Sequence, residues 1–393
     1  MARHYRYISG DSHLQVDSRR WIDRIPEGHR DRAPRLVRLP DGADAWLVEG
    51  SPLRQDASDI YGGKGRDEWQ PFGQRYEGTP GTGTGEQRIR EQDTDGIDAE
   101  VLFPAQQAGP RLWRSISDDD AYRAVVRAYN DFLAEDYCSA DPERLIGVGV
   151  LPWSGVDDAI DEMEHCAKQG LKAVVLGRFP SGRGLPTPAD DRFWSAALDI
   201  GIAVTVHVEL DRSAEKAGLL TYLKQPKELG NGPGSGIVEQ VTNAKFCRLG
   251  AVNAVQLIFA GVFDRFPRLQ IDFAENQIGW IPFFLEMADE RYERHRYWAE
   301  RLLDVPPLEM RPSEYIREHC YWGFQHDRVG VELRHHLGTD RIIWATDFPH
   351  QESDWPNSLD VVEKNFATVP DEERYQMVAG NSISFFHLDA LPS

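Results

Sequence analysis

The 393-residue sequence has few cysteines and no pattern that would join them in pairs. The four cysteines are widely spaced and form no C-x-x-C pair; they are Cys138, Cys166, Cys247 and Cys320. This spacing argues against a disulfide framework and against a structural zinc knot, and it favours reduced thiols in a cytoplasmic protein. The first residues also lack the apolar segment of a signal peptide, which favours the same location.

Long apolar runs and an excess of positive charge are absent as well. No apolar stretch reaches the roughly 18 residues that a membrane span needs, so we expect no membrane association. The chain has 64 Asp and Glu against 44 Lys and Arg, a formal net charge of −20. This acidity argues against nucleic acid or an anionic membrane as a partner. We therefore expect a small-molecule substrate, which a local pocket could still accept if it were anionic.

Eight short runs rich in β-branched residues alternate with patterns typical of helices. The runs cover residues 6–13, 98–104, 144–152, 171–177, 202–209, 269–276, 320–325 and 341–350. The clearest helical patterns cover residues 117–138, 155–170 and 278–303. Such alternation predicts an α/β protein with a closed parallel (β/α)₈ barrel, or TIM barrel. An open doubly wound sheet is the alternative, but its G-x-G-x-x-G turn is missing after the first strand.

Two long segments interrupt this alternation within what we interpret as one barrel domain, residues 1–393. Residues 14–97 follow the first strand and contain the glycine-rich stretch EGTPGTGTGEQ. Because no G-K-[ST] sequence is present, we interpret this stretch as part of a surface insertion rather than as a phosphate loop. The second segment, residues 227–240, follows the fifth strand. Both begin at carboxyl ends of strands, where barrel active sites form, so we expect them to shape the active-site face.

Side chains of the kind that bind metals recur at the carboxyl ends of four predicted strands. Asp11 and His13 end the first strand, His207 lies near the end of the fifth, Glu275 ends the sixth, and Asp347 ends the eighth. Residues i and i+2 of a strand point the same way, and the carboxyl ends of barrel strands share one rim. Oxygen and nitrogen ligands without cysteine suit Zn²⁺ or Mn²⁺, with Fe²⁺ as a further candidate. The pattern therefore predicts a metal site.

Each of these residues also has a simpler interpretation. A histidine within an apolar strand, such as His207, is commonly a hydrogen-bonded core residue. Glu275 could contribute to the N-terminal cap of the following helix, and Asp347 could cap a turn. Four separate strands nevertheless deliver a ligand-type residue at the same end, and this coincidence favours the metal site.

Four further residues are candidates for substrate binding. His350 follows Asp347 in the loop after the eighth strand, and Arg178, just past the fourth strand, could clamp a substrate carboxylate. Phe324 and Phe348 lie close to strand ends, and such aromatic residues favour a flat aromatic or conjugated acid as the substrate.

The order of these motifs resembles the amidohydrolase superfamily, and within it the branch named for aminocarboxymuconate semialdehyde decarboxylase. The resemblance rests on D-x-H in the first strand, the strand-five histidine, GVFDRFPRLQIDFAENQIGW and DRIIWATDFPHQESDWP, and it extends to GNSISFFHL at 380–388. It implies one divalent metal ion per chain and a homodimer or homotetramer. The ligands that it implies are Asp11, His13, His207 and Asp347. Many decarboxylases of this branch have a histidine where this chain has Glu275.

Two reactions suit this set of residues, and the sequence leaves both open. In a non-oxidative decarboxylation, the metal holds the acid while Asp347 or Glu275 delivers a proton before CO₂ leaves. In a hydrolysis, Asp347 activates water for attack on an amide, lactone or vinylogous acyl carbon, and Glu275 protonates the leaving group. The first-strand carboxylate and the branch resemblance favour decarboxylation. A non-catalytic scaffold is a third alternative, which predicts a lost ligand, and none of the four is lost.

Overall fold

The structure is a computed structural model that describes most of the chain. The described residues are 3–51, 53, 60, 63–68, 70, 73–105, 109–208, 210 and 248–388. The predicted insertion at 227–240 and Cys247 lie outside the described residues. Within the described part, no helix combines the length and the apolar character that crossing a membrane requires.

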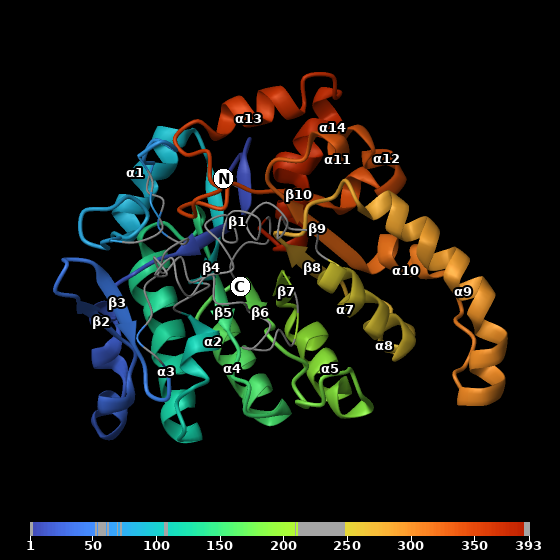
Figure 1. Ribbon diagram of the computed structural model, residues 1–393, viewed down its shortest axis with the longest axis horizontal. Helices are drawn as coiled ribbons and strands as arrows, with labels where there is room; N and C mark the ends of the chain where they lie inside the picture. Colours follow the sequence, from blue (N-terminus) through green and yellow to red (C-terminus); the bar gives the residue numbers. More distant parts are fainter. Residues whose placement is uncertain are drawn as a thin grey trace, which may run out of the picture.

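Eight parallel strands form the centre of the molecule (Figure 1). In chain order they are β1 (Ile8–Leu14), β4 (Ala99–Pro104), β5 (Leu145–Val150), β6 (Ala173–Val175), β7 (Ala203–His207), β8 (Ile271–Ala274), β9 (Cys320–Phe324) and β10 (Ile342–Trp344). Each strand pairs in parallel with the next along the chain. Every predicted strand is present, although each is shorter than its apolar run, and the predicted (β/α)₈ barrel is confirmed.

The first and last strands meet at their carboxyl ends through backbone hydrogen bonds. The amide of Asp347 donates to the carbonyl of Asp11 at 2.9 Å, and the amide of His13 donates to the carbonyl of Phe348 at 2.7 Å. Close approach lower in β1 depends on Gly10, because a Cβ atom there would lie 2.1 Å from Cγ2 of Ile343. Closure of the barrel therefore brings the first-strand residues beside Asp347.

Helices surround the barrel (Figure 1). The longer ones are α1 (Gly85–Asp95), α3 (Asp119–Phe132), α4 (Val156–Lys168), α5 (Asp191–Ile200), α7 (Arg248–Phe259), α9 (Ile281–Leu303), α10 (Pro312–His319) and α13 (Ser358–Asn365). The shorter ones are α2 (Pro110–Trp113), α8 (Val262–Arg265), α11 (Arg328–Glu332), α12 (Arg334–Leu337), α14 (Asp371–Tyr375) and α15 (Asn381–Phe385). The three clearest helical patterns of the sequence correspond to α3, α4 and α9.

Sequence signals fix the start of α3 and the face that it buries. The side chain of Asp118 accepts a hydrogen bond from the amide of Ala121 and so caps the helix. Val125, Val126 and Tyr129 follow at helical spacing and are buried. The cap and the apolar stripe together dock this helix on the outside of the barrel.

The long segment between β1 and β4 is only partly an insertion. It contains an antiparallel hairpin of β2 (Arg35–Arg38) and β3 (Asp44–Leu47), and it ends in α1. The predicted surface position of the glycine-rich stretch is wrong for its central part, because Gly81, Thr82 and Gly83 are buried. Gly81 has a φ of 82°, and a Cβ atom there would lie 2.4 Å from Pro349, so glycine permits close packing on the loop after β10.

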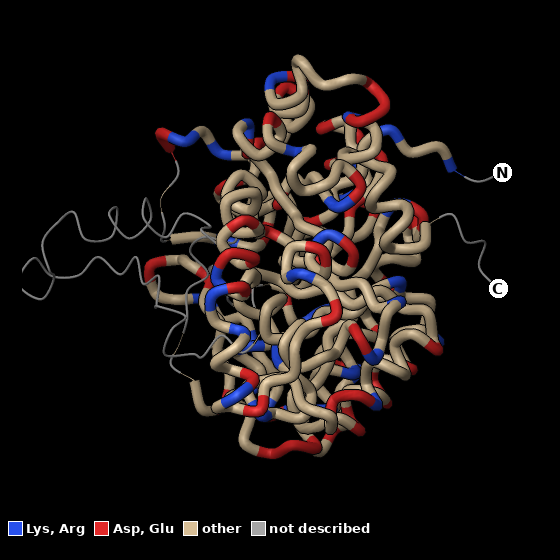
Figure 2. The backbone as a smooth tube through the Cα atoms, turned by 90° about the vertical axis from the view of Figure 1, so that its right-hand side faces the viewer, with Lys and Arg blue, Asp and Glu red and all other residues tan. Residues whose placement is uncertain are grey.

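The strong negative charge of the chain is spread over the molecule. Acidic and basic residues are interspersed over the visible part of the backbone, and neither sign covers a whole side of this view (Figure 2). A charged ligand would therefore be recognised by the local groups of a site and not by one large field.

Candidate metal centre and substrate pocket

Two histidines from opposite parts of the chain face each other at the carboxyl ends of β1 and β7. The Nε2 atoms of His13 and His207 lie 3.1 Å apart. Asp11 lies against both rings, with its Oδ1 3.4 Å from Nε2 of His13 and its Oδ2 3.4 Å from Nε2 of His207. Glu275 places Oε2 3.3 Å from Nε2 of His207. All four residues are buried or nearly so.

These separations suit ligands that share one metal ion. Two atoms bound at about 2.1 Å to the same ion lie about 3.0–3.4 Å from each other, depending on the coordination angle. The histidine nitrogens and carboxylate oxygens also form a donor set of the kind that Zn²⁺ and Mn²⁺ accept. The distances and the donor types therefore both suit a single divalent metal ion.

The hydrogen bonds around the cluster give an independent test of this fit. Both carboxylate oxygens of Asp11 are buried and accept no hydrogen bond from the described residues. An ionised carboxylate is costly to bury in this way unless a cation neutralises it. Nδ1 of His13 lies 3.0 Å from the carbonyl oxygen of Pro104, so it donates its proton there and leaves the lone pair of Nε2 directed at the cluster. The residues therefore fit a divalent cation.

Asp347 and His350 form a second group that overlaps the first at His13. Oδ1 of Asp347 lies 3.2 Å from Nε2 of His13 and 2.9 Å from Nδ1 of His350. The ring of His350 stacks on that of His13, with 3.8 Å between the ring centroids. The structure thus brings together all five strand-end residues that the sequence singled out. Glu275, which the sequence suggested as a catalytic group, also lies where a ligand would be.

The backbone at the ends of β8 and β10 adopts an unusual conformation. Glu275 and Asp347 have φ angles of 58° and 55°, in the left-handed region that residues other than glycine rarely occupy. Such a conformation costs on the order of 1 kcal/mol and persists only where the surroundings impose it. Hydrogen bonds supply that constraint. After Glu275 the amides of Asn276 and Gln277 both donate to the carbonyl of Gly323 at 3.0 Å, and the amide of Asp347 donates to the carbonyl of Asp11 at 2.9 Å.

The carboxylates around His13 change its proton affinity. Burial alone would lower the pKa of His13, but a hydrogen bond with Asp347 and the charges of Asp11, Asp347 and Glu275 outweigh it and raise the pKa to about 9. Without a bound cation, the imidazole is therefore protonated at neutral pH. A metal ion entering the cluster must take the place of this proton.

Arg88, on α1, is a residue of the site that sequence reasoning missed. The side chain is fully buried, and Nε donates to Oε2 of Glu100 at 2.6 Å. Its terminal nitrogens also donate to the carbonyl oxygens of His13 at 3.1 Å and Phe348 at 3.0 Å. One guanidinium therefore fixes the two chain segments that carry His13 and Asp347.

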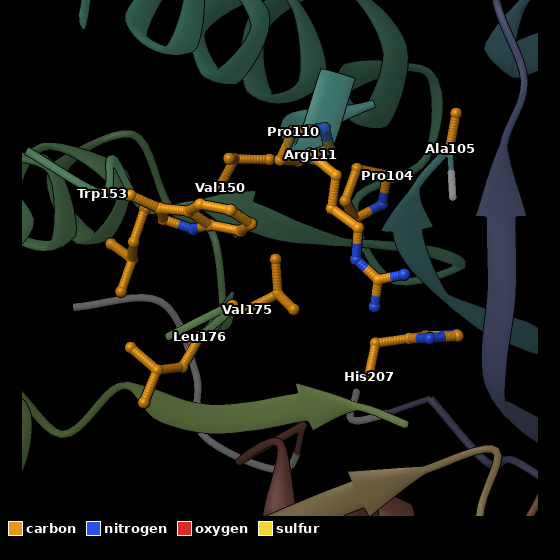
Figure 3. Close-up of a pocket in the computed structure, with 11 residues that line it drawn as sticks. Pro104, Ala105, Pro110, Arg111, Val150, Trp153, Val175, Leu176 and His207 are labelled. Carbon is orange, nitrogen blue, oxygen red and sulfur yellow. The ribbon is translucent and has the colours of Figure 1, made fainter. Parts of the chain in front are cut away.

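A cavity that opens to solvent lies beside His207, with about 430 Å³ of empty space when the solvent at its mouth is included (Figure 3). The lining comes from the carboxyl ends of neighbouring strands and from the start of α2. The lining residues are Pro104, Ala105, Pro110, Arg111, Val150, Leu151, Trp153, Val175, Leu176, Gly177 and His207. Arg111 is the only Lys, Arg, Asp or Glu among them, and its guanidinium points towards the ring of His207 (Figure 3).

None of the four residues predicted to bind substrate is among the described residues that line this cavity, and His350 lies instead beside Asp347. Arg178 donates from its guanidinium to the carbonyl oxygen of Gly182 at 3.2 Å. Phe324 is fully buried, and the ring of Phe348 is buried beneath the guanidinium of Arg88. The roles of all four in substrate binding stay predictions.

Comparisons with known proteins agree with this geometry. The model of the amidohydrolase family matches residues 67–388, so the chain belongs to this family, as the sequence motifs predicted. A gamma-resorcylate decarboxylase of Rhizobium sp. (strain MTP-10005) is 26% identical over 293 residues, which cover 70% of this chain and 81% of the relative. The 2-amino-3-carboxymuconate-6-semialdehyde decarboxylase of Dictyostelium discoideum is 25% identical over 309 residues, covering 77% of this chain and 76% of that protein.

A solved structure with the same fold also contains a metal ion. The dihydroxybenzoic acid decarboxylase of Polaromonas sp. JS666, with bound manganese and the inhibitor 2-nitroresorcinol, superposes with a TM-score of 0.61. It is 18% identical to this chain, and the match covers 99% of this chain and 98% of that one. This likeness independently supports the barrel fold.

Proposed function

We propose that the protein is a metal-dependent, non-oxidative decarboxylase of an aromatic or conjugated carboxylic acid. The observation that carries the proposal is the position of the cavity, whose apolar walls open onto His207 in the cluster of metal-ligand type residues. Two sequence relatives named as decarboxylases of conjugated or aromatic acids support the same reaction.

In this proposal, one divalent ion, Mn²⁺ or Zn²⁺, is held by Asp11, His13, His207 and Glu275. The manganese in the Polaromonas enzyme supports the choice of metal. Asp347 was expected as the fourth ligand, and its distance of 3.2 Å from Nε2 of His13 leaves it close enough to touch either the ion or the substrate. When bound, the ion supplies a Lewis acid that holds the substrate carboxylate and a neighbouring oxygen.

The protein residues then supply orientation and a proton. Asp347, held by Nδ1 of His350 at 2.9 Å, transfers a proton to the carbon that bears the carboxylate. The bond between that carbon and the carboxylate breaks, CO₂ leaves without charge, and the electron pair of the broken bond restores the conjugated system. Asp347 is left ionised and regains its proton from solvent. Val150, Val175 and Trp153 exclude water from the substrate ring.

Release of CO₂ from aromatic acids tests the proposal. The manganese-loaded protein is incubated with hydroxybenzoic and dihydroxybenzoic acids, including 2,6-dihydroxybenzoate, and CO₂ and the decarboxylated product are measured together. We expect equal amounts of both, and release that is slower by about 10²–10⁴ from Asp347→Asn. An enzyme that instead cleaves lactones or aryl amides in a parallel panel, without CO₂, would show that the hydrolytic alternative is correct.

We also propose that the enzyme works in the cytoplasm as a homodimer or homotetramer. Three buried free cysteines, Cys138, Cys166 and Cys320, support a reducing compartment. Exposed apolar side chains on α9 support self-association, since Phe283 and Leu302 are 70% and 66% exposed. Light scattering of the protein as it elutes from a size-exclusion column measures the mass of the assembly directly. The mass of a monomer at micromolar concentration would contradict the proposed homodimer or homotetramer.

A further inference from the structure

We propose that Arg111 is the residue that binds the carboxylate of the substrate, at the end of the cavity nearest the metal centre. The inference rests on the proposed function for the identity of the substrate, but the contact itself is tested by binding alone. Arg178, the clamp suggested by the sequence, directs its guanidinium to the carbonyl of Gly182.

The position of Arg111 is set by a short helix that is anchored from its other side. Leu112 and Trp113 are buried, and the ring of Trp113 packs against Tyr129 and Trp21, with centroid distances of 5.1 and 5.5 Å. This packing fixes α2 and leaves Arg111 to extend into the cavity, towards His207 (Figure 3). The backbone of Arg111 is therefore held in place before any ligand arrives, which reduces the entropy lost on binding.

The remaining walls favour a flat ring attached to this anionic group. The indole of Trp153 forms one side of the cavity (Figure 3), and the hydroxyl of Tyr122 lies 3.1 Å from its backbone nitrogen. At Gly177 a Cβ atom would lie 2.4 Å from the indole ring, so only glycine lets the indole lie flat there. A ring beside Trp153 and Val175 would direct its carboxylate towards Arg111 and His207.

The charge balance of the site explains why a guanidinium is needed there. While Asp347 holds the proton that it transfers, Asp11 and Glu275 already cancel the two positive charges of a divalent ion, so the centre offers no net attraction to another anion. Among the described residues that line the cavity, Arg111 is the one Lys or Arg, and its planar fork matches a carboxylate. It therefore supplies a positive charge at the place where the acid enters.

This contact acts on binding and on the release of product. The carboxylate loses its charge as it becomes CO₂, so Arg111 stabilises the bound acid more than the transition state. Removing the guanidinium should then raise KM with little loss of kcat. The decarboxylated product lacks the group that Arg111 binds, so the same residue favours the acid over the product.

Benzoate and benzamide form a probe pair of nearly equal shape that differ in charge. Benzoate has no ring hydroxyl to activate it for CO₂ loss, so its affinity can be measured by calorimetry on the manganese-loaded protein without turnover. For the wild type we expect benzoate to bind about 10- to 100-fold more tightly than benzamide. Arg111→Met should reduce this preference at least tenfold, and Arg111→Lys should retain part of it because the charge remains.

Arg192→Met is the control, because the side chain of Arg192 is 70% exposed and pairs with Asp157 at 2.8 Å outside the cavity lining. It should leave both affinities within about twofold of the wild type. Thermal melting of each variant establishes that it is folded. Equal binding of the two probes, no measurable benzoate binding, or an unchanged preference in folded Arg111→Met would each overturn the proposal. Failure to find a decarboxylated substrate would refute the proposed function but leave this binding result unaffected.

Discussion

The Nε2 atoms of His13 and His207 lie 3.1 Å apart although 194 positions separate the two residues in the chain. Both nitrogens direct lone pairs or protons into the same small space, which also receives the carboxylate of Asp11. Two neutral imidazoles with facing lone pairs repel each other, so a proton or a metal ion must lie between them. The strongest predictions concern which cation takes this place.

Replacing His207 should empty the centre. We expect about one equivalent of Mn or Zn per chain in the wild type and less than about a tenth of that in His207→Ala, because two facing ligands become one. Elemental analysis of both proteins after growth with added Mn and Zn measures this. His335→Ala is the control, since His335 is 62% exposed and lies on α12. Equal metal content in wild type and His207→Ala would mean that the ion binds elsewhere.

Metal affinity should depend on pH through His13. The carboxylates around it overcome the effect of burial and raise its pKa to about 9 in the metal-free protein. Below this pH the incoming ion displaces a proton, so affinity should rise about tenfold per pH unit up to about pH 9 and then level off. Calorimetric titration of Mn²⁺ into chelator-treated protein between pH 6.5 and 9.5 tests this, and buffers of different ionisation enthalpy count the proton released. A manganese affinity that does not change with pH would exclude His13 as a ligand.

Arg88 should contribute to stability as well as to the metal centre. Arg88→Met leaves the buried carboxylate of Glu100 without its cation, and breaking such a pair costs about 3–5 kcal/mol. It also frees the carbonyl oxygens of His13 and Phe348, so metal affinity should fall together with the free energy of unfolding. Denaturant titration and manganese calorimetry measure the two effects.

Two further variants test whether the loss of stability in Arg88→Met comes from the unpaired buried charge of Glu100. Arg328→Met removes an exposed i,i+4 pair with Glu332 and should change the free energy of unfolding by less than about 0.5 kcal/mol. The double variant Arg88→Met, Glu100→Gln also removes the charge of Glu100. This charge is then no longer buried without its cation, so we expect part of the lost free energy of unfolding to return. If Arg88→Met were as mild as Arg328→Met, the buried pair would not matter for folding.

The fold was predictable because barrel strands are buried on both faces and appear as short apolar runs, such as RLIGVGVLP before α4. The residues at the strand ends were predictable because a (β/α)₈ topology places all carboxyl ends on one rim. Arg88 was not, since the buried face of α1 is polar. That face contains Arg88, Glu91, Gln92 and Asp95, which are at helical spacing but give no apolar signal.

Arg111 was missed for a different reason. Its short helix gives too few residues for a periodic pattern, and only the fold shows that it enters the cavity. The left-handed backbone at Glu275 and Asp347 likewise arises from tertiary hydrogen bonds and leaves no trace in residue type. The local sequence pattern thus predicted which side chains lie at the strand ends. The residues around them are determined by contacts between distant segments, which the pattern does not show.

Asp272 should make the stability of the protein depend on pH. Burial and the nearby charge of Asp11 raise its pKa to about 8, although a hydrogen bond from Thr205 opposes the change. Between pH 3.8 and 8 the folded state keeps a proton that the unfolded state has lost. The free energy of unfolding should therefore fall as pH rises through this window, by at most about 1.4 kcal/mol per unit, and this contribution should be constant above it.

Asp272→Asn removes this titration while its amide oxygen can still accept the hydrogen bond from Thr205. Denaturant titrations of chelator-treated wild type and variant at pH 5 to 9 should show a shallower decline for the variant. Parallel curves for the two proteins would show that Asp272 titrates normally in the folded state.

Neutral replacements of Asp347 and Glu275 should have different effects, because only Glu275 lies in the group that contains both His13 and His207. Glu275→Gln removes a charged ligand, so we expect weaker manganese binding and activity that returns in part at high Mn²⁺. Asp347→Asn leaves Asp11, His13, His207 and Glu275 in place but removes the proton donor. It should bind manganese within about tenfold of the wild type while kcat falls by about 10²–10⁴ and does not recover with added metal. The reverse pattern, with metal lost from Asp347→Asn and kept in Glu275→Gln, would make Asp347 the ligand and Glu275 the proton donor, because the two carboxylates flank the same pair of imidazoles.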